Sequence, residues 1–450
     1  MKAAKFAIAA IVAGLMSSAS AQAETLGDAL VQAYKNSGLL QQNRALLRAA
    51  DEDVAASVAL LRPVVGYVVG ANYSSITKST GANADLTVGL LLFEFGRAGL
   101  RSDAAKENVL SLREALIGVE QKVLLGAVSA YTGVQRDGAI VALRDNNVQL
   151  ITQELRAAKD RFEVGEITRT DVAIAEARLA SARSLQAAAQ GNLARSRETY
   201  RAAIGAYPGV LAPRPTPPAT ASSLESARAM ARNRHPDILQ ARRSVTLAEL
   251  NIALAMAAMK PSLRADARMS LSDGGNDTTS LSLNLSGPIY QGGGLASAAR
   301  KAAALRDASK AGLHLTRLGV DQEVGNSWAA LVVANAAVQA TDQQIRAARV
   351  AFRGVREEAS LGARTTLDVL NAEQELLDAE ANKVSAESDR YVAVYRVLSS
   401  MGLLTVNHLK LGVATYDPVA YYNTVKSAPA FNVSPQGQKL DRVLKSLGKF

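Results

Sequence analysis

The sequence predicts a mainly α-helical chain that repeats one structural unit twice and adds a few β-strands of membrane-spanning length. Three observations support this fold class: very long proline-free stretches, short segments of alternating apolar and polar residues, and matching motifs that recur 197 residues apart. The chain has 450 residues, no cysteine and only 4% aromatic residues. This composition excludes a disordered or disulfide-stapled chain, and its small apolar side chains suit closely packed helices.

The first segment of the chain, residues 1–23, has the pattern of a secretory signal peptide. Lys2 and Lys5 precede the apolar run Phe6–Met16, and Ala21–Ala23 forms a small-x-small cleavage site. The apolar run is too short to span a bilayer as a helix, which needs about 20 residues. We therefore expect the mature chain to leave the cytoplasm.

The remaining chain contains two copies of one pattern. Leu92–Gly96 corresponds to Ile289–Gly293, and Thr168–Val172 corresponds to Thr365–Val369, with the members of each pair 197 residues apart. This period is far longer than a solenoid repeat and indicates a duplicated domain. The expected units are a first structural repeat at 24–207, a proline-rich linker at 208–222, a second structural repeat at 223–411 and a partly disordered C-terminal tail at 412–450.

Each repeat shows the same order of elements. A helical segment ends at Pro63 or Pro261, because proline lacks the amide donor that a helix needs. Two strands follow, and then a long helix turns at Gly165 or Gly362 and returns as a second helix. At about 1.5 Å per residue, such helices are on the order of 100 Å long. The expected first segments are 26–61 and 224–259; the strands are about 64–75, 85–93, 263–272 and 280–289; the long helices are about 97–163, 170–204, 295–361 and 367–401.

The strands carry an apolar and a polar face. In the third strand, Leu263 and Ala265 alternate with Arg264 and Asp266. Strands of about ten residues with one apolar face suit a membrane β-barrel, although a half-buried soluble sheet shows the same alternation. Four strands cannot close a barrel, because the smallest bacterial barrels have eight. Three chains would together supply a 12-stranded barrel, continued by an α-helical periplasmic tunnel.

The sequence predicts no catalytic residue, cofactor or metal site, and hence no enzyme. Its three histidines lie in separate segments, and the glycine run Gly292–Gly294 lacks the Lys-Ser/Thr of a phosphate-binding loop. The formal charge of +10 is spread along the helices among acidic residues rather than gathered in one block. A nucleic-acid partner is therefore not expected.

Taken together, these features resemble the TolC family of trimeric outer-membrane channel-tunnels. The resemblance covers Glu24–Leu411 and rests on the duplicated strand-to-helix joins Leu92–Gly96 and Ile289–Gly294, the Pro63/Pro261 pair and the Gly-x-x-Thr-x-x-Asp-Val turns. It implies a homotrimeric exit duct in outer-membrane lipid with its helical part in the periplasm. Such a duct receives proteins or small molecules from an inner-membrane transporter, ABC or proton-driven, through a periplasmic adaptor protein, in type I secretion or multidrug efflux.

The resemblance also implies gate residues at the periplasmic tip. Asp368 falls where family members place a ring of aspartates from the second repeat, and the second acid of that ring falls on Asn371. The expected ring therefore contains one acidic residue per chain here rather than two. Asp171 and Arg364 match two members of a polar link between the repeats. The tip turns themselves would contain Gly165, Thr168, Gly362 and Thr365.

Two alternatives remain open at this stage. Thr168-x-x-Asp171 and Thr365-x-x-Asp368 also have the pattern of capping boxes that open a helix. The two roles are compatible, because a capping carboxylate at a pore mouth still carries its charge. For the whole chain, the second candidate is a periplasmic adaptor-like coiled-coil protein without membrane strands, which would not need four alternating strands.

Overall fold

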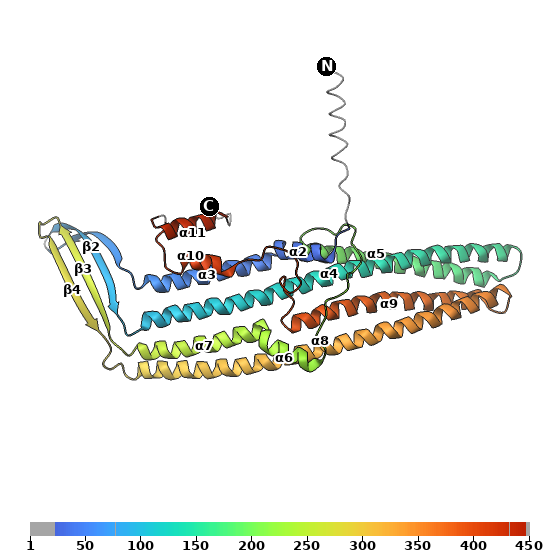
Figure 1. The fold of residues 1–450 in the computed structure, drawn as a ribbon. Coiled ribbons are helices and arrows are strands. Elements are labelled where there is room, and N and C mark those ends of the chain that lie inside the picture. Colours follow the sequence, from blue (N-terminus) through green and yellow to red (C-terminus); the bar gives the residue numbers. More distant parts are fainter. Residues whose placement is uncertain (1–22, 77, 432, 447–450) are drawn as a thin grey trace, which may run out of the picture.

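The computed structural model describes residues 23–446 with the exception of 77 and 432, so the expected signal peptide lies outside the described residues apart from Ala23. The described chain is an elongated rod (Figure 1). A four-stranded sheet forms one end, and two helical hairpins run side by side to the opposite end.

The first helical segment of each repeat is broken into two helices, which corrects the expectation of continuous segments at 26–61 and 224–259. The first repeat has α2 and α3, which meet at Ser37, and the second has α6 and α7, which meet at His235. Each junction residue is extended and caps the following helix. His235 also precedes a proline, which disfavours helical geometry. The bounds are Leu26–Asn36 for α2, Gly38–Ala59 for α3, Leu224–Arg234 for α6 and Pro236–Ala257 for α7.

The four strands form one antiparallel sheet in the order β1-β2-β3-β4. The sheet joins the two repeats, because β2 of the first pairs with β3 of the second. The two outer strands, β1 and β4, each have one edge with no partner strand among the described residues. The bounds are Val64–Ser74 for β1, Ser79–Phe93 for β2, Ser262–Ser272 for β3 and Thr278–Ser286 for β4.

Two strand ends differ most from the sequence-based expectation. β2 begins at Ser79 rather than at residue 85, since residues 79–84, which precede the expected strand, pair with β1 through their backbones. β4 ends at Ser286 rather than at residue 289, where Pro288 has no amide to donate to a strand ladder. Ile289 and Tyr290 lie beyond the strand and are exposed.

Two antiparallel helical hairpins make up most of the rod. The first consists of α4 (Arg97–Glu163) and α5 (Arg169–Ile204), and the second of α8 (Gly294–Ser360) and α9 (Thr366–Ser400). Both α4 and α8 contain 67 residues. α9 also packs along α4, so that the second hairpin is held against the first.

The largest apolar core lies at the middle of the rod, where both repeats meet. It combines side chains of all the helices from α2 to α9, and its fully buried members include Tyr131, Tyr200 and Leu398. The Tyr131 hydroxyl lies 3.0 Å from the carbonyl oxygen of Glu24 and 2.6 Å from that of Ala212. The start of the described chain and the interrepeat linker are thereby attached to this core.

The C-terminal tail, for which partial disorder is expected, contains two helices within its described residues. These are α10 (Pro418–Val425) and α11 (Pro435–Ser446), and they lie on the outside of α3 (Figure 1). The buried Val425 and the hydroxyl of Tyr421, which donates to Glu52 at 2.5 Å, hold the tail there. Across the described residues, no helix has the length and apolar character needed to cross a membrane.

Candidate functional site

The free ends of the two hairpins are built in the same way. A glycine with positive φ follows two residues after the end of each long helix, with 82° at Gly165 and 79° at Gly362, a backbone conformation that glycine adopts without strain. The next residue donates back to the helix, from Glu166 N to Arg161 O and from Ala363 N to Glu358 O, both at 2.9 Å. These C-terminal caps reverse the chain and place both turns at one end of the rod.

The returning helices open with the capping boxes that the sequence suggests. Asp171 Oδ2 accepts from the backbone N–H and the hydroxyl of Thr168, at 2.9 and 2.7 Å, and Asp368 Oδ2 does so from Thr365 at 3.0 and 2.8 Å. Hydrogen bonds from the side chain and backbone of Thr168 hold the pKa of Asp171 below its usual range. The corresponding bonds from Thr365 do the same for Asp368. Both carboxyl groups are therefore charged at neutral pH.

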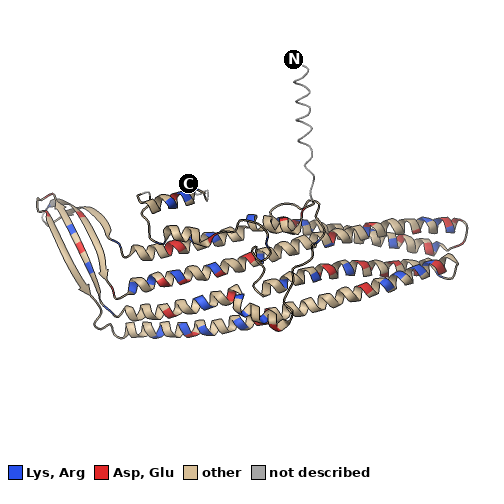
Figure 2. Cartoon of the chain, in the orientation of Figure 1, with Lys and Arg blue, Asp and Glu red and all other residues tan. Residues whose placement is uncertain are grey.

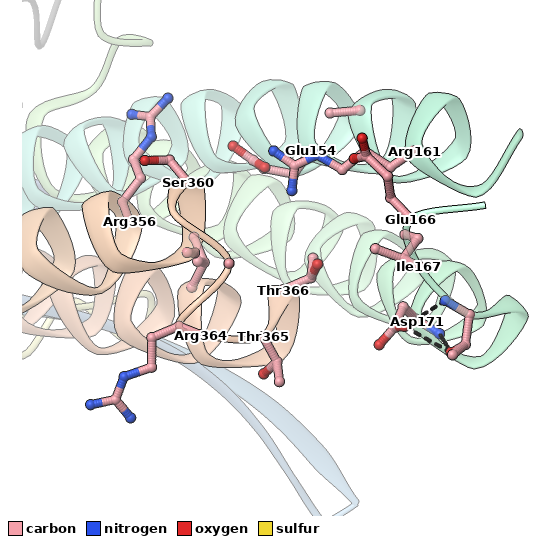
Figure 3. A pocket seen from close by; sticks show the side chains of 15 residues that line it. Glu154, Arg161, Glu166, Ile167, Asp171, Arg356, Ser360, Arg364, Thr365 and Thr366 are labelled. Carbon is pink, nitrogen blue, oxygen red and sulfur yellow. Dashed lines mark hydrogen bonds between the residues drawn. The ribbon is translucent and has the colours of Figure 1, made fainter. Parts of the chain in front are cut away.

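Between the two turns lies a cavity of about 790 Å³ (Figure 3). Asp171 and Arg364 both line it, but they do not form the expected ion pair. Arg364 Nε instead donates to Glu358 Oε2 at 2.8 Å, within its own turn, and its guanidinium is directed away from Asp171 in Figure 3. Each residue has a nearer partner in its own turn. Arg364 binds the carboxylate of Glu358, six residues earlier, and Asp171 binds the hydroxyl of Thr168, three residues earlier.

A different polar contact connects the repeats near the tip. Arg178 Nη2 of α5 donates to Asn371 Oδ1 of α9 at 2.5 Å. The sequence singled out Asn371 as the missing second acid of a ring, and the structure shows it bound by a cation instead. Nothing in the spacing of Arg178 indicates this partner, since the two residues are 193 positions apart.

Further along the hairpins, α4 and α9 meet through apolar and polar side chains. Leu370 packs with Ile151, Leu179 and Ala182 in a small buried cluster shared by both hairpins. Two polar pairs lie deeper in the rod: Asn147 Nδ2 donates to Glu373 Oε1 at 2.9 Å, and Arg144 Nη2 donates to Asp378 Oδ1 at 3.3 Å. Neither pair was predicted from the sequence. The available signal was that Asn147 lies four residues before Ile151, on the same helix face.

At the opposite end of the rod, one face of the sheet is apolar and exposed. The antiparallel register aligns Tyr67, Leu86 and Met269 in one row across β1, β2 and β3. Tyr67 is 81% exposed and Leu281 of β4 is 80% exposed. Large apolar side chains in such a contiguous patch are typical of a surface that contacts lipid or another protein.

The other face of the sheet is polar and carries paired charges. Arg268 donates to both carboxylate oxygens of Asp85, at 2.8 and 3.3 Å, and Arg264 Nε donates to Asp266 Oδ1 at 2.9 Å. Figure 2 shows charged residues on the strands and both signs of charge along the long helices. Among the described residues, no group of three or more His, Asp or Glu side chains has a metal-binding arrangement.

An apolar-faced sheet that continues into paired helical hairpins, in a chain duplicated end to end, defines an outer-membrane transport protein of the channel-tunnel type. The profile of the outer membrane efflux protein family matches residues 29–206 and 227–403, one match for each repeat. The chain belongs to the outer membrane efflux protein family.

Similar proteins agree with this assignment over almost the whole chain. The outer membrane efflux protein BepC of Brucella suis is 35% identical over 439 residues, which is 93% of this chain and 94% of that protein. The outer membrane protein TolC of Vibrio cholerae is 27% identical over 410 residues, 87% and 93% of the two chains. The crystal structure of the Campylobacter jejuni CmeC outer membrane channel superimposes with a TM-score of 0.76 at 14% identity, covering 91% of this chain and 90% of that one. The chain is thus an outer-membrane protein of the efflux and secretion class.

Proposed function

We propose that this protein forms a homotrimeric exit duct, with its sheet in the outer membrane and its hairpins in the periplasm. The observation that carries this proposal is a sheet with an apolar exposed face and two free edges, on β1 and β4. Unpaired backbone groups at a sheet edge are not tolerated in lipid. Pairing β1 of one chain with β4 of the next removes both edges, and three chains complete a barrel of twelve strands.

The same arrangement gives the helical hairpins a role as the wall of a tunnel. Because the hairpins continue directly from the sheet, three copies would enclose a passage that ends at the tip turns. We propose that a periplasmic adaptor protein docks there and connects the duct to an inner-membrane transporter. The 35% identical relative is named an efflux protein. Small molecules are therefore the first cargo to test.

The tip residues support a gate. Three copies of Asp368 around the threefold axis would form a ring of carboxylates, which attracts cations and limits the passage of anions. The capping bonds from Thr365 do not compete with this role, because they keep the Asp368 carboxylate ionised and fixed in position. In the gate we propose, the second hairpin separates from the first when the duct opens, which breaks the Arg178–Asn371 contact. The cavity that holds Asp171 and Arg364 would widen in the same movement.

Electron microscopy of the mature protein purified in detergent tests the duct directly. The expected particle has threefold symmetry, a short membrane belt and a long hollow stem. A monomeric rod or hairpin without a belt would contradict the proposal and favour the adaptor-like alternative. Reconstitution into planar lipid bilayers provides a second test. Discrete steps of ion conductance are expected only from a complete trimeric barrel, in which every strand edge is paired.

A further inference from the structure

Glu373 occupies an unusual position in the contact between the two repeats. Its side chain is buried, with 6% of the residue exposed, and it lies between Leu370 and Leu377 at the three- and four-residue spacing of a packed helix face. Its Oε1 accepts from Asn147 of α4, whereas its Oε2 is buried and has no hydrogen-bond partner. A carboxylate in such a place loses hydration that the protein does not replace.

The surroundings of Glu373 do not neutralise its charge. Beside it is a cavity of about 160 Å³ whose other lining is mostly apolar and includes Leu143, Leu150 and Phe352. The cation that acts on it is Arg356 of α8, while Glu154 of α4 opposes ionisation. Three other charged residues of these helices form contacts of their own, although the buried Nη1 of Arg144 has no hydrogen-bond partner. They are Arg144 of α4 with Asp378, Arg178 of α5 with Asn371, and Glu380 of α9 with Arg349 of α8.

Burial raises the pKa of the Glu373 carboxyl from its usual 4.5 to about 7, although the hydrogen bond from Asn147 acts in the opposite direction. When α9 moves away from α4, water reaches the carboxyl and its usual value returns. The packed arrangement therefore binds the proton more tightly than the separated one. By linkage, packing is strongest at low pH, weakens as the pH rises from about 4.5 to about 7, and changes little above that.

We propose that Glu373 is a pH-sensitive contact between the repeats. The neutral carboxyl keeps α9 packed on α4, and ionisation favours their separation and the widening of the tip. This inference rests on the proposed function, because it takes the separation of the hairpins as the opening step. It implies that the duct opens more readily at neutral pH than in acid, with up to a tenfold change in the ratio of separated to packed hairpins per pH unit and per chain.

The first test measures channel opening in planar lipid bilayers from about pH 5 to about pH 8. The full-length trimer is compared with Glu373→Gln, which is permanently neutral and nearly isosteric. We expect the open probability of the unaltered protein to rise with pH, and that of Glu373→Gln to stay at the acid value throughout. Glu375→Gln is the matched control, because Glu375 is an exposed carboxylate of the same helix and should leave the pH dependence unchanged.

The second test follows the hairpins themselves. The sequence has no cysteine, so Val164→Cys and Leu361→Cys give two unique spin-label positions, one in each tip turn. With one labelled chain per trimer, the intrachain distance should increase between about pH 5 and about pH 8, and Glu373→Gln should abolish the change. A pH response that persists in Glu373→Gln, or a distance that is constant in the unaltered protein, would overturn the inference. Absence of trimers or channels would instead refute the duct, since the intrachain distance is still measurable in a single chain.

Discussion

Replacing Leu370 by alanine should loosen the two hairpins without unfolding either of them. Leu370 is 3% exposed and packs with Ile151, Leu179 and Ala182, so it joins α9 to the first hairpin rather than to its own partner helix. Truncation of a buried leucine costs about 2–5 kcal/mol. The small cluster lies near the free end of the rod, which favours the lower value of about 2 kcal/mol. This is roughly a 30-fold shift toward separated hairpins, since 1.4 kcal/mol corresponds to about tenfold.

The assay is the frequency of openings of reconstituted channels, with Leu361→Ala as the control. Leu361 belongs to the tip turn and is 85% exposed, so its truncation removes the same atoms without emptying a packed site. We expect Leu370→Ala to open at least several times more often than Leu361→Ala, with the same thermal unfolding temperature for the mid-rod core. Equal opening frequencies in the two variants would refute the reasoning that this cluster holds the repeats together.

Three further predictions concern the tip and the tail. Asp368→Ala should raise the conductance or reduce the preference for cations, because it removes the proposed carboxylate ring; an unchanged conductance and reversal potential would exclude the gate role. Alanine substitutions of Arg178 and Asn371, alone and together, should show a measurable coupling of up to about 1 kcal/mol per chain for opening, since the contact is largely exposed. If the effects of the two substitutions are additive in this double-mutant cycle, the contact takes no part in the gate. Tyr421→Phe should release the C-terminal tail more easily, by about 1 kcal/mol, because Glu52 loses its donor. Protease cleavage of the tail measures this, and an unchanged cleavage rate would contradict it.

The duplicated helical architecture was predictable because its signals are local and strong. Proline-free stretches define the long helices, and the glycines at 165 and 362 mark their turns, where the structure has positive φ angles. The capping boxes were also readable, since both partners lie within three residues. The breaks at Ser37 and His235 were less visible, because a single extended residue interrupts an otherwise helical composition.

The contacts between repeats were beyond the reach of sequence reasoning. Arg364 was expected to pair with Asp171 of the other repeat, yet Glu358 is six residues away and closes the bond inside one turn. Asn371 was considered only as a missing acid, whereas its amide oxygen accepts from Arg178. Such pairs depend on how two helices are rotated and offset along each other, and a single sequence contains no direct record of that geometry.

The equal length of α4 and α8 constrains how this rod can change. Both helices have 67 residues, and both run from the sheet end of the rod to a tip turn. An insertion of four residues in only one of them would advance its tip by about 6 Å and rotate it by about 40° relative to the other. The returning helix of that hairpin would need a matching change. A change in how far the duct extends into the periplasm therefore requires matching insertions in all four long helices. The lengths of the two hairpins are thus coupled, and neither repeat can change its length alone.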